Sequence, residues 1–203
     1  MIDERFVILA VIVNFAGSLN YLVNTLKGDT KPNRVTWFLW ALFPMIAFSA
    51  MLDKDVGTTP LVLTFMSGFM PLMIFSGSFI NRNAFWKITR FDWTCGILSF
   101  AGLILWFITR EGNIAIALSI LADALALLPT LVKSYKFPKT ESWAAFGGAA
   151  AAAFITMLTI KVWTFAAVAF PLYIFIVCVI LSVLIKFKIG PKLTPSIKGI
   201  PND

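Results

Sequence analysis

The residue with the clearest potential for chemistry is Asp123, which lies near the middle of an apolar run over 114–132. A carboxylate at the centre of a membrane helix costs about 2.5–3.5 kcal/mol on insertion scales, so such residues usually face a bundle interior or a water-filled cavity. Ser119 and Thr130 lie four residues before it and seven residues after it, on the same helix face. We expect Asp123 to bind a hydroxyl or amine group of a solute or to take up a proton. The alternatives are a purely structural hydrogen bond and a protonated side chain that packs without a function.

A second polar face lies in the first apolar run, over 6–26. Its side chains have the spacing of one helix face, and they are Asn14, Ser18, Tyr21 and Asn24. At an offset of 106 residues, Gly17 falls on Asp123 and Asn24 falls on Thr130. Matching polar faces in two helices that lipid should make apolar favour a solvated path between them. Hydrogen bonding between helices is the alternative, and each such bond is worth only about 0.6–2 kcal/mol.

The residues that most enzymes use for catalysis are missing from the sequence. It contains no histidine, which removes the commonest general base and the commonest metal ligand. It also has no Gly-rich phosphate loop. Its two cysteines, Cys95 and Cys178, lie in separate apolar runs, where cysteine is usually a small packing residue. We therefore expect no enzyme activity, no cofactor and no metal site.

Composition places the chain in a lipid bilayer. Hydrophobic residues make up 59% of the 203 residues and charged residues 13%, and the mean hydropathy is +0.87. A soluble domain would carry about 25% charged residues. The net charge of +7 sits in short loops between apolar runs, where it sets membrane topology and does not indicate nucleic-acid binding. The expected location is the plasma (inner) membrane.

Apolar segments approach the length of about 20 residues that a membrane-spanning helix needs. Seven of them cover 6–26, 35–52, 60–80, 93–109, 114–132, 143–160 and 165–185. Of the 17 Lys and Arg residues, four fall on one side of the membrane (Arg5, Lys54, Arg110 and Lys161) and thirteen on the other. The positive-inside rule then predicts an outside N-terminus and an inside C-terminus. The polar, Pro- and Gly-rich residues 187–203 predict a flexible cytoplasmic tail.

An internal repeat organises these segments. Residues 22–37 align with residues 128–143 at an offset of 106, and residues 71–75 align with residues 171–175 at an offset of 100. The repeat predicts an all-α membrane protein with two parallel three-helix bundles joined by a linker helix. The first bundle would cover 1–80, the linker with the fourth helix 81–112, and the second bundle 113–186.

The second copy of the repeated loop resembles the PQ-loop signature, a Pro-Gln pair at a helix end followed by a basic, Ser/Thr-rich loop. Here Pro129-Thr130 precedes Val132-Lys133-Ser134-Tyr135-Lys136 and Lys139-Thr140-Glu141-Ser142. Thr130 replaces the glutamine, and Val23-Asn24 stands at the corresponding position of the first copy. With its duplicated seven-helix plan, the chain is similar to the SWEET sugar transporters and their PQ-loop relatives. The resemblance implies alternating access between the bundles, with a sugar as the first substrate class.

Several residues are candidates for moving parts. Pro71 and Pro171 are repeat-equivalent and would kink corresponding helices, and Pro129 would kink the helix of Asp123. Trp37 and Trp143 lie beside the repeated loops, where an inner gate and an interfacial aromatic belt are alternative roles. Gly147 and Gly148 predict close helix packing.

The sequence thus predicts a transporter that moves a small polar solute across a bilayer. The solute would bind midway between the bundles, between the first and fifth helices and their neighbours. A proton-coupled amino-acid transporter and a vitamin transporter similar to those for nicotinamide riboside are alternatives, and so is a sorting receptor with the same fold. The sequence leaves the oligomeric state open.

Overall fold

The structure is a computed structural model that describes residues 2–3, 5–52, 58–109 and 112–193. Within these ranges the chain forms α-helices and short 3-10 turns and no β-strand, which confirms the all-α prediction. The elements are α1 (Phe6–Lys27), α2 (Arg34–Met51), α3 (Thr58–Gly77), η1 (Arg82–Ala84), α4 (Arg90–Thr109), α5 (Gly112–Lys136), η2 (Pro138–Thr140), α6 (Trp143–Thr159), α7 (Phe165–Phe187) and α8 (Ile189–Leu193).

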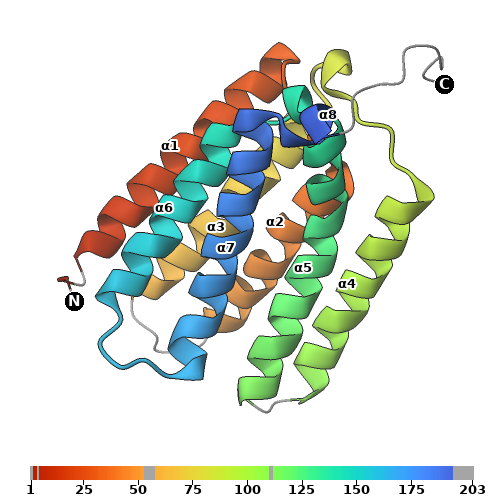
Figure 1. Cartoon of the computed structure of the whole chain (residues 1–203). Helices are drawn as coiled ribbons and strands as arrows, with labels where there is room; N and C mark the ends of the chain where they lie inside the picture. Colours follow the sequence, from red (N-terminus) through yellow and green to blue (C-terminus); the bar gives the residue numbers. More distant parts are fainter. Residues whose placement is uncertain (1, 4, 53–57, 110–111, 194–203) are drawn as a thin grey trace.

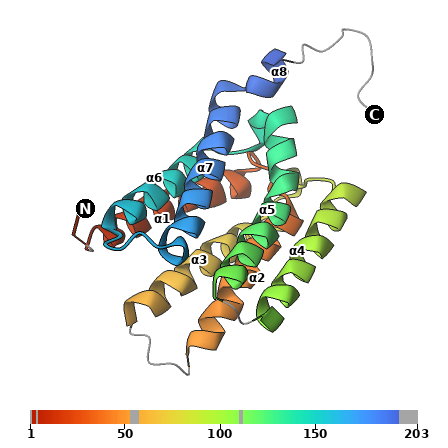
Figure 2. The same ribbon diagram turned by 60° about the horizontal axis from the view of Figure 1, so that its bottom comes forward.

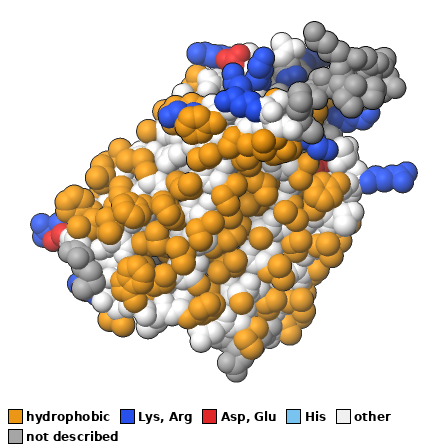
Figure 3. All heavy atoms as spheres, viewed as in Figure 1, with side chains coloured by type: hydrophobic (Ala, Val, Ile, Leu, Met, Phe, Trp, Pro, Cys, Tyr) orange, Lys and Arg blue, Asp and Glu red, His pale blue; other side chains and the backbone are white. Residues whose placement is uncertain are grey.

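The helices carry an apolar surface. By length and composition, three segments within the described ranges could cross a membrane: Phe6–Lys27, Ile116–Lys136 and Phe165–Phe187. Shorter apolar helices cover Arg34–Ser49, Thr64–Gly77 and Trp143–Thr159. Hydrophobic side chains cover the middle of the face seen in Figure 3. Soluble proteins rarely expose so much contiguous apolar surface, so we conclude that the chain is a membrane protein.

Lys and Arg side chains gather at one end of the molecule (Figure 3). This end carries the α1–α2, α3–α4 and α5–α6 connections together with α8 (Figure 1). We call it the basic end. Two of the four basic residues predicted for the opposite side, Lys54 and Arg110, lie outside the described residues.

The helices of the first and last thirds of the chain pack in the same order. In the first third, α3 packs against both α1 and α2, and in the last third α7 packs against both α5 and α6. The two groups also meet crosswise, since α1 packs along α6 and α2 packs, over a shorter stretch, against α5 (Figures 1 and 2). The fourth helix, α4, lies against α5 and α2.

The contact between α1 and α6 is close because both helices present glycine to it. A Cβ atom on Gly17 would lie 2.9 Å from the carbonyl oxygen of Ala144, and one on Gly148 would lie 3.0 Å from that of Val13. Larger residues at these positions would push the two backbones apart. The close packing predicted from Gly147 and Gly148 is confirmed for Gly148, whereas Gly147 faces Ser182 on α7.

Four helices continue through an internal proline: α2 through Pro44, α3 through Pro71, α5 through Pro129 and α7 through Pro171. Proline removes a backbone donor, so nearby carbonyl groups accept other donors. In the turns before Pro129, the Thr36 hydroxyl donates to the carbonyl oxygen of Ala126 at 2.7 Å, and the Ser99 hydroxyl donates to that of Ala122. Side chains from α2 and α4 therefore donate to backbone carbonyl groups of α5 in the turns before Pro129.

Some predicted boundaries were wrong. The third helix ends at Gly77 and not at residue 80; there Arg34 donates to the Ser78 hydroxyl and carbonyl oxygens, which hold the chain in a turn. The fifth helix continues past residue 132 to Lys136.

The tail over 187–203 was expected to be flexible from its start. Instead α7 reaches Phe187, Lys188 ends it in a left-handed conformation, and α8 follows. The absence of a side chain at Gly190 lets α8 lie against the backbone of Tyr135. Residues 194–203 lie outside the described residues.

Candidate functional site

The carboxylate of Asp123 lies where three helices come together. Asp123 is on α5 and is part-buried, and the Tyr173 hydroxyl on α7 donates a 2.8 Å hydrogen bond to its Oδ2 atom. The indole of Trp40 on α2 also interacts with the carboxylate. The site therefore joins α5 and α7 to a helix from the first third of the chain.

Trp40 belongs to a group of aromatic rings that we call the aromatic cluster: Tyr21, Trp37, Trp40 and Phe146. Ring centroids lie 4.7 Å apart for Tyr21 and Trp37, 5.2 Å for Trp37 and Trp40, and 6.4 Å for Phe146 with both Tyr21 and Trp40. Because α1, α2 and α6 each contribute, the cluster spans the contact between the first and last thirds of the chain.

The Asp123 site contains a negative charge without a positive partner. No Lys or Arg within 2–3, 5–52, 58–109 or 112–193 forms an ion pair with Asp123. Nearby, the Nε1 atom of Trp37 is buried and forms no full hydrogen bond in the described structure, although the Trp37 side chain interacts with the Tyr21 hydroxyl. Buried polar groups in native proteins normally have partners, which are often water or a ligand.

A second carboxylate, that of Glu141, is paired at the basic end. Its Oε1 atom lies 2.6 Å from the Lys133 ammonium, and its Oε2 atom accepts a 2.6 Å hydrogen bond from the Tyr21 hydroxyl. Lys133 also donates to the carbonyl oxygen of Lys31 and lies over the ring of Trp86, 4.7 Å from its centroid. The Lys133 and Glu141 side chains are 1% and 0% exposed. We call these groups the basic-end cluster.

The basic-end cluster links segments that are distant in sequence. Tyr21 and Lys31 belong to α1 and its following loop, whereas Lys133 and Glu141 belong to α5 and its following loop. Beside it, the Asn33 side chain caps the first turn of α2 and donates at 3.0 Å to Asp92 at the start of α4. These contacts close the basic end with buried polar groups.

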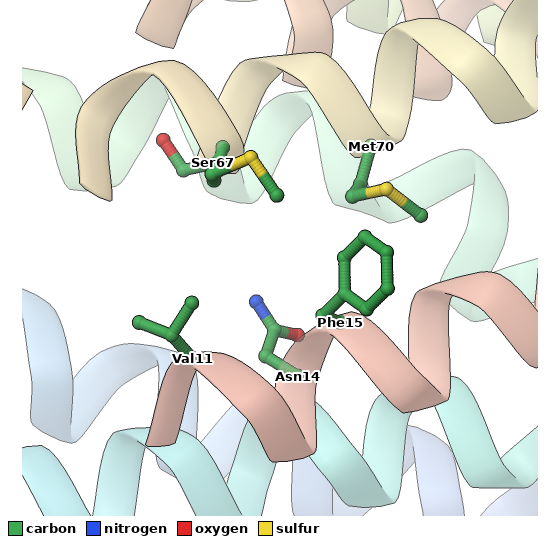
Figure 4. A pocket seen from close by; sticks show the side chains of 6 residues that line it. Val11, Asn14, Phe15, Ser67 and Met70 are labelled. Atoms are coloured by element: carbon green, nitrogen blue, oxygen red, sulfur yellow. The ribbon is translucent and has the colours of Figure 1, made fainter. Parts of the chain in front are cut away.

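The other polar residues predicted on the first helix do not reach Asp123. Asn14 points from α1 toward α3 and lines a cavity of about 60 Å³ with Val11, Phe15, Met66, Ser67 and Met70 (Figure 4). A water molecule occupies about 30 Å³, so this cavity would admit water but no sugar. Ser18 is half-buried, and Asn24 donates to Asn20 at 3.1 Å.

Ser119 and Thr130 share α5 with Asp123 but have different surroundings. The Ser119 hydroxyl donates locally, to the carbonyl oxygen of Ile116 at 2.8 Å. Thr130 is completely buried, and its hydroxyl has no partner in the described structure. Neither residue contacts the Asp123 carboxylate through a hydrogen bond that the structure describes.

The candidate gating residues also differ from one another. Trp37 is buried in the aromatic cluster, whereas its repeat-equivalent Trp143 is 46% exposed, with the Lys186 ammonium 4.4 Å from its ring centroid. An interfacial role fits Trp143 better than a gate inside the protein. Pro71, Pro129 and Pro171 lie inside continuous helices, and the gating role of all five residues stays a prediction.

Sequence reasoning missed the partners of both carboxylates. Tyr173 lies within the second repeated segment, residues 171–175, and this position could have drawn attention to it. Lys133 and Glu141 lie within the repeated loop, but their sequence context suggested exposed loop charges. Trp40 and Phe146 carry no local signal, because only the packing of α2 and α6 brings them to the site.

Comparisons with known proteins give no match: no family of known proteins, no curated protein and no solved structure matches this chain.

Proposed function

We propose that this chain is a membrane transporter that moves a small polar solute by alternating access. Its moving units would be α1–α3 and α5–α7, with α4 as the linker, in the seven-crossing arrangement with an outside N-terminus. Transporters with parallel repeats bind their solutes near the midplane, between the repeats. In this proposal the chain is not an enzyme, and the basic end faces the cytoplasm.

The packing order of the helices supports two equivalent units. Each third helix lies between the first and second helices of its own group. Across the groups, the first helix of each packs against the second helix of the other, as α1 does with α6 and α5 does with α2. A two-fold relation between the units would produce this crosswise pattern. It agrees with the internal repeat in the sequence.

The observation that carries the proposal is the position of Asp123. Its carboxylate is held by Tyr173 within the second unit and faces Trp40 of the first unit. An unpaired acid at this depth is costly in a membrane protein, and such residues usually mark solute or ion pathways. Motion of one unit against the other would change the surroundings of this carboxylate.

The basic-end cluster supports a conformation that is closed toward the cytoplasm. Tyr21 of the first unit binds Glu141 of the second, and Lys133 of the second binds the carbonyl oxygen of Lys31. Separation of the units at this end would have to break these contacts. Tyr21 also belongs to the aromatic cluster, so a change at the Asp123 site can reach the closed end through one side chain.

By resemblance, a sugar is the first substrate class. Proton-coupled transport of an amino acid or vitamin is the second candidate, because Asp123 is a titratable group between the units. A sorting receptor with this fold would bind cargo without moving a solute across the membrane.

Uptake into proteoliposomes tests the proposal. We expect the full chain to accumulate at least one of a panel of radiolabelled sugars, amino acids, amines and vitamins, and Asp123→Asn to slow that uptake. Asp29→Asn is the matched control, because Asp29 is an exposed carboxylate at the basic end. Binding of a solute without uptake would favour the receptor. An uptake rate and pH profile unaltered by Asp123→Asn would remove Asp123 from the mechanism.

A further inference from the structure

We infer that the Asp123 site and the aromatic cluster bind a small organic cation that carries a hydrogen-bond acceptor. This inference rests on the proposed function and specifies its substrate class. It differs from the sugar class that the resemblance implies.

The charge of the site calls for a positive partner. At low dielectric, an isolated carboxylate is far more costly than one paired with a cation. Tyr173 donates to the Asp123 carboxylate, but a phenol hydroxyl does not neutralise charge. No Lys or Arg of the described ranges pairs with it. A neutral sugar would leave the charge uncompensated, whereas a cationic solute would supply the missing partner.

The aromatic cluster provides surfaces that attract a cation. The faces of Trp, Tyr and Phe rings carry negative potential, and cages of such rings recognise ammonium groups. Here each ring of the aromatic cluster contacts two others of the cluster, with ring centroids no more than 6.4 Å apart. Trp40 joins this cluster to the carboxylate. The rings pack on one another in this conformation, so a solute would enter as the units separate.

The basic-end cluster shows the same combination with its cation in place. There the Glu141 carboxylate pairs with the Lys133 ammonium, which lies over the Trp86 ring. The Asp123 site offers the corresponding carboxylate and indole from Asp123 and Trp40, without a cation from the described chain. The comparison shows how this protein arranges an acid and an aromatic ring around an ammonium group.

The buried Nε1 atom of Trp37 indicates a further feature of the solute. It forms no full hydrogen bond in the described structure, although it lies near enough to the Tyr21 hydroxyl to interact with it. A solute with a hydroxyl or carbonyl oxygen near its cationic group would satisfy this donor. An amino alcohol or a similar small cation fits these requirements.

Matched pairs of solutes test the inference with the purified full chain. Choline and 3,3-dimethyl-1-butanol have nearly the same shape, and so do tyramine and 4-propylphenol, but only the first of each pair is cationic. We expect at least one of the two cations to bind, with its neutral counterpart weaker by about tenfold or more. Binding would be measured by displacement of the radiolabelled cation and by the rise in melting temperature that a bound ligand produces.

Variants locate the binding. Asp123→Asn should weaken binding of the cation by about tenfold or more and leave the neutral counterpart unchanged. Tyr173→Phe keeps the ring and removes only the hydroxyl, whereas Trp40→Phe keeps an aromatic face but makes it smaller and removes the indole N–H; both should weaken cation binding less. They serve as the test if Asp123→Asn fails to fold, as judged by its melting curve. Asp29→Asn should bind like the original chain.

The outcomes separate this inference from the proposed function. If glucose is taken up while neither cation binds, the cation class is wrong and the transporter proposal stands. If a cation binds in an Asp123-dependent way and no solute is taken up, the site stands and the transporter proposal fails. Equal binding of each cation and its neutral counterpart, or no binding of either cation, overturns the inference.

Discussion

The two carboxylates in the interior of this protein differ in what surrounds them. Glu141 at the basic end has an ammonium partner at 2.6 Å, a phenol donor at 2.6 Å and almost no solvent exposure. Asp123 has a phenol donor and an indole neighbour but no cation from the described residues. A buried charge with a complete set of partners fixes one arrangement of the chain. In our proposal, a charge without them leaves a position for a solute cation.

The largest expected effect comes from removing the cation of the paired site. Lys133→Met would leave the Glu141 carboxylate buried and unpaired, and breaking a buried pair in this way costs about 3–5 kcal/mol. We expect a clearly lower melting temperature for the detergent-purified protein, measured by tryptophan fluorescence. Lys139→Met is the control, because Lys139 carries the same charge in η2, shortly after the end of α5, but is exposed.

The double variant Lys133→Met with Glu141→Gln sharpens this result. It removes both charges, so most of the lost stability should return, as happens when buried ion pairs are replaced by neutral groups. If Lys133→Met alone leaves the melting temperature unchanged, the ion pair of Lys133 and Glu141 does not stabilise the protein, and the proposed difference between Glu141 and Asp123 is wrong.

A smaller effect is expected where the two sites share a residue. Tyr21→Phe keeps the ring in the aromatic cluster but removes the hydroxyl that donates to Glu141. A hydrogen bond to a charged group contributes about 1.5–3 kcal/mol. We expect a moderate loss of stability and faster exchange of solute through the basic end of reconstituted protein.

Tyr135→Phe is the matched control for Tyr21→Phe, because it removes a phenol hydroxyl near the basic end that donates no hydrogen bond described in the structure. Identical melting temperatures and exchange rates for the two variants would contradict the role given to Tyr21.

The smallest effect is expected at the hydroxyl contact that lies between the two sites along α5. Thr36→Val keeps the side-chain shape but removes the donor to Ala126, and such bonds within membranes average about 0.6 kcal/mol. Stability should fall only slightly. Thr36→Ser, which keeps the hydroxyl, should restore it. A loss as large as that of Lys133→Met would mean that the helix around Pro129 depends on this one bond.

The helical character of the chain was predictable, because the sequence itself carries that signal, whereas the depth of Asp123 in the membrane stays a prediction. Asp123 interrupts an apolar run, and apolar length marks helices. Its partners were not predictable, since Tyr173 lies 50 residues away in sequence and no local pattern states which helices meet.

The polar face of α1 shows the limit of periodicity. Spacing placed Asn14, Ser18 and Tyr21 on one face, yet Tyr21 reaches Glu141 while Asn14 lines a cavity against α3. A helix face is broad enough to contact two neighbours.

The burial of Lys133 was not predictable either. A lysine in a basic segment is usually exposed, and here the ion pair with Glu141 compensates for the cost of burying its charge.

The contact between α1 and α6 sets how the two halves can rearrange. Where Gly17 and Gly148 meet the opposite backbone, the helices have no side-chain layer on which to slide. The contact between α2 and α5 is shorter and includes the hydroxyl bond of Thr36. In the proposed transporter, the helices would therefore move least at the contact of Gly17 and Gly148. The two units would separate most at the contact between α2 and α5, beside α4. Crosslinking α1 to α6 should leave that movement intact, whereas crosslinking α2 to α5 should arrest it.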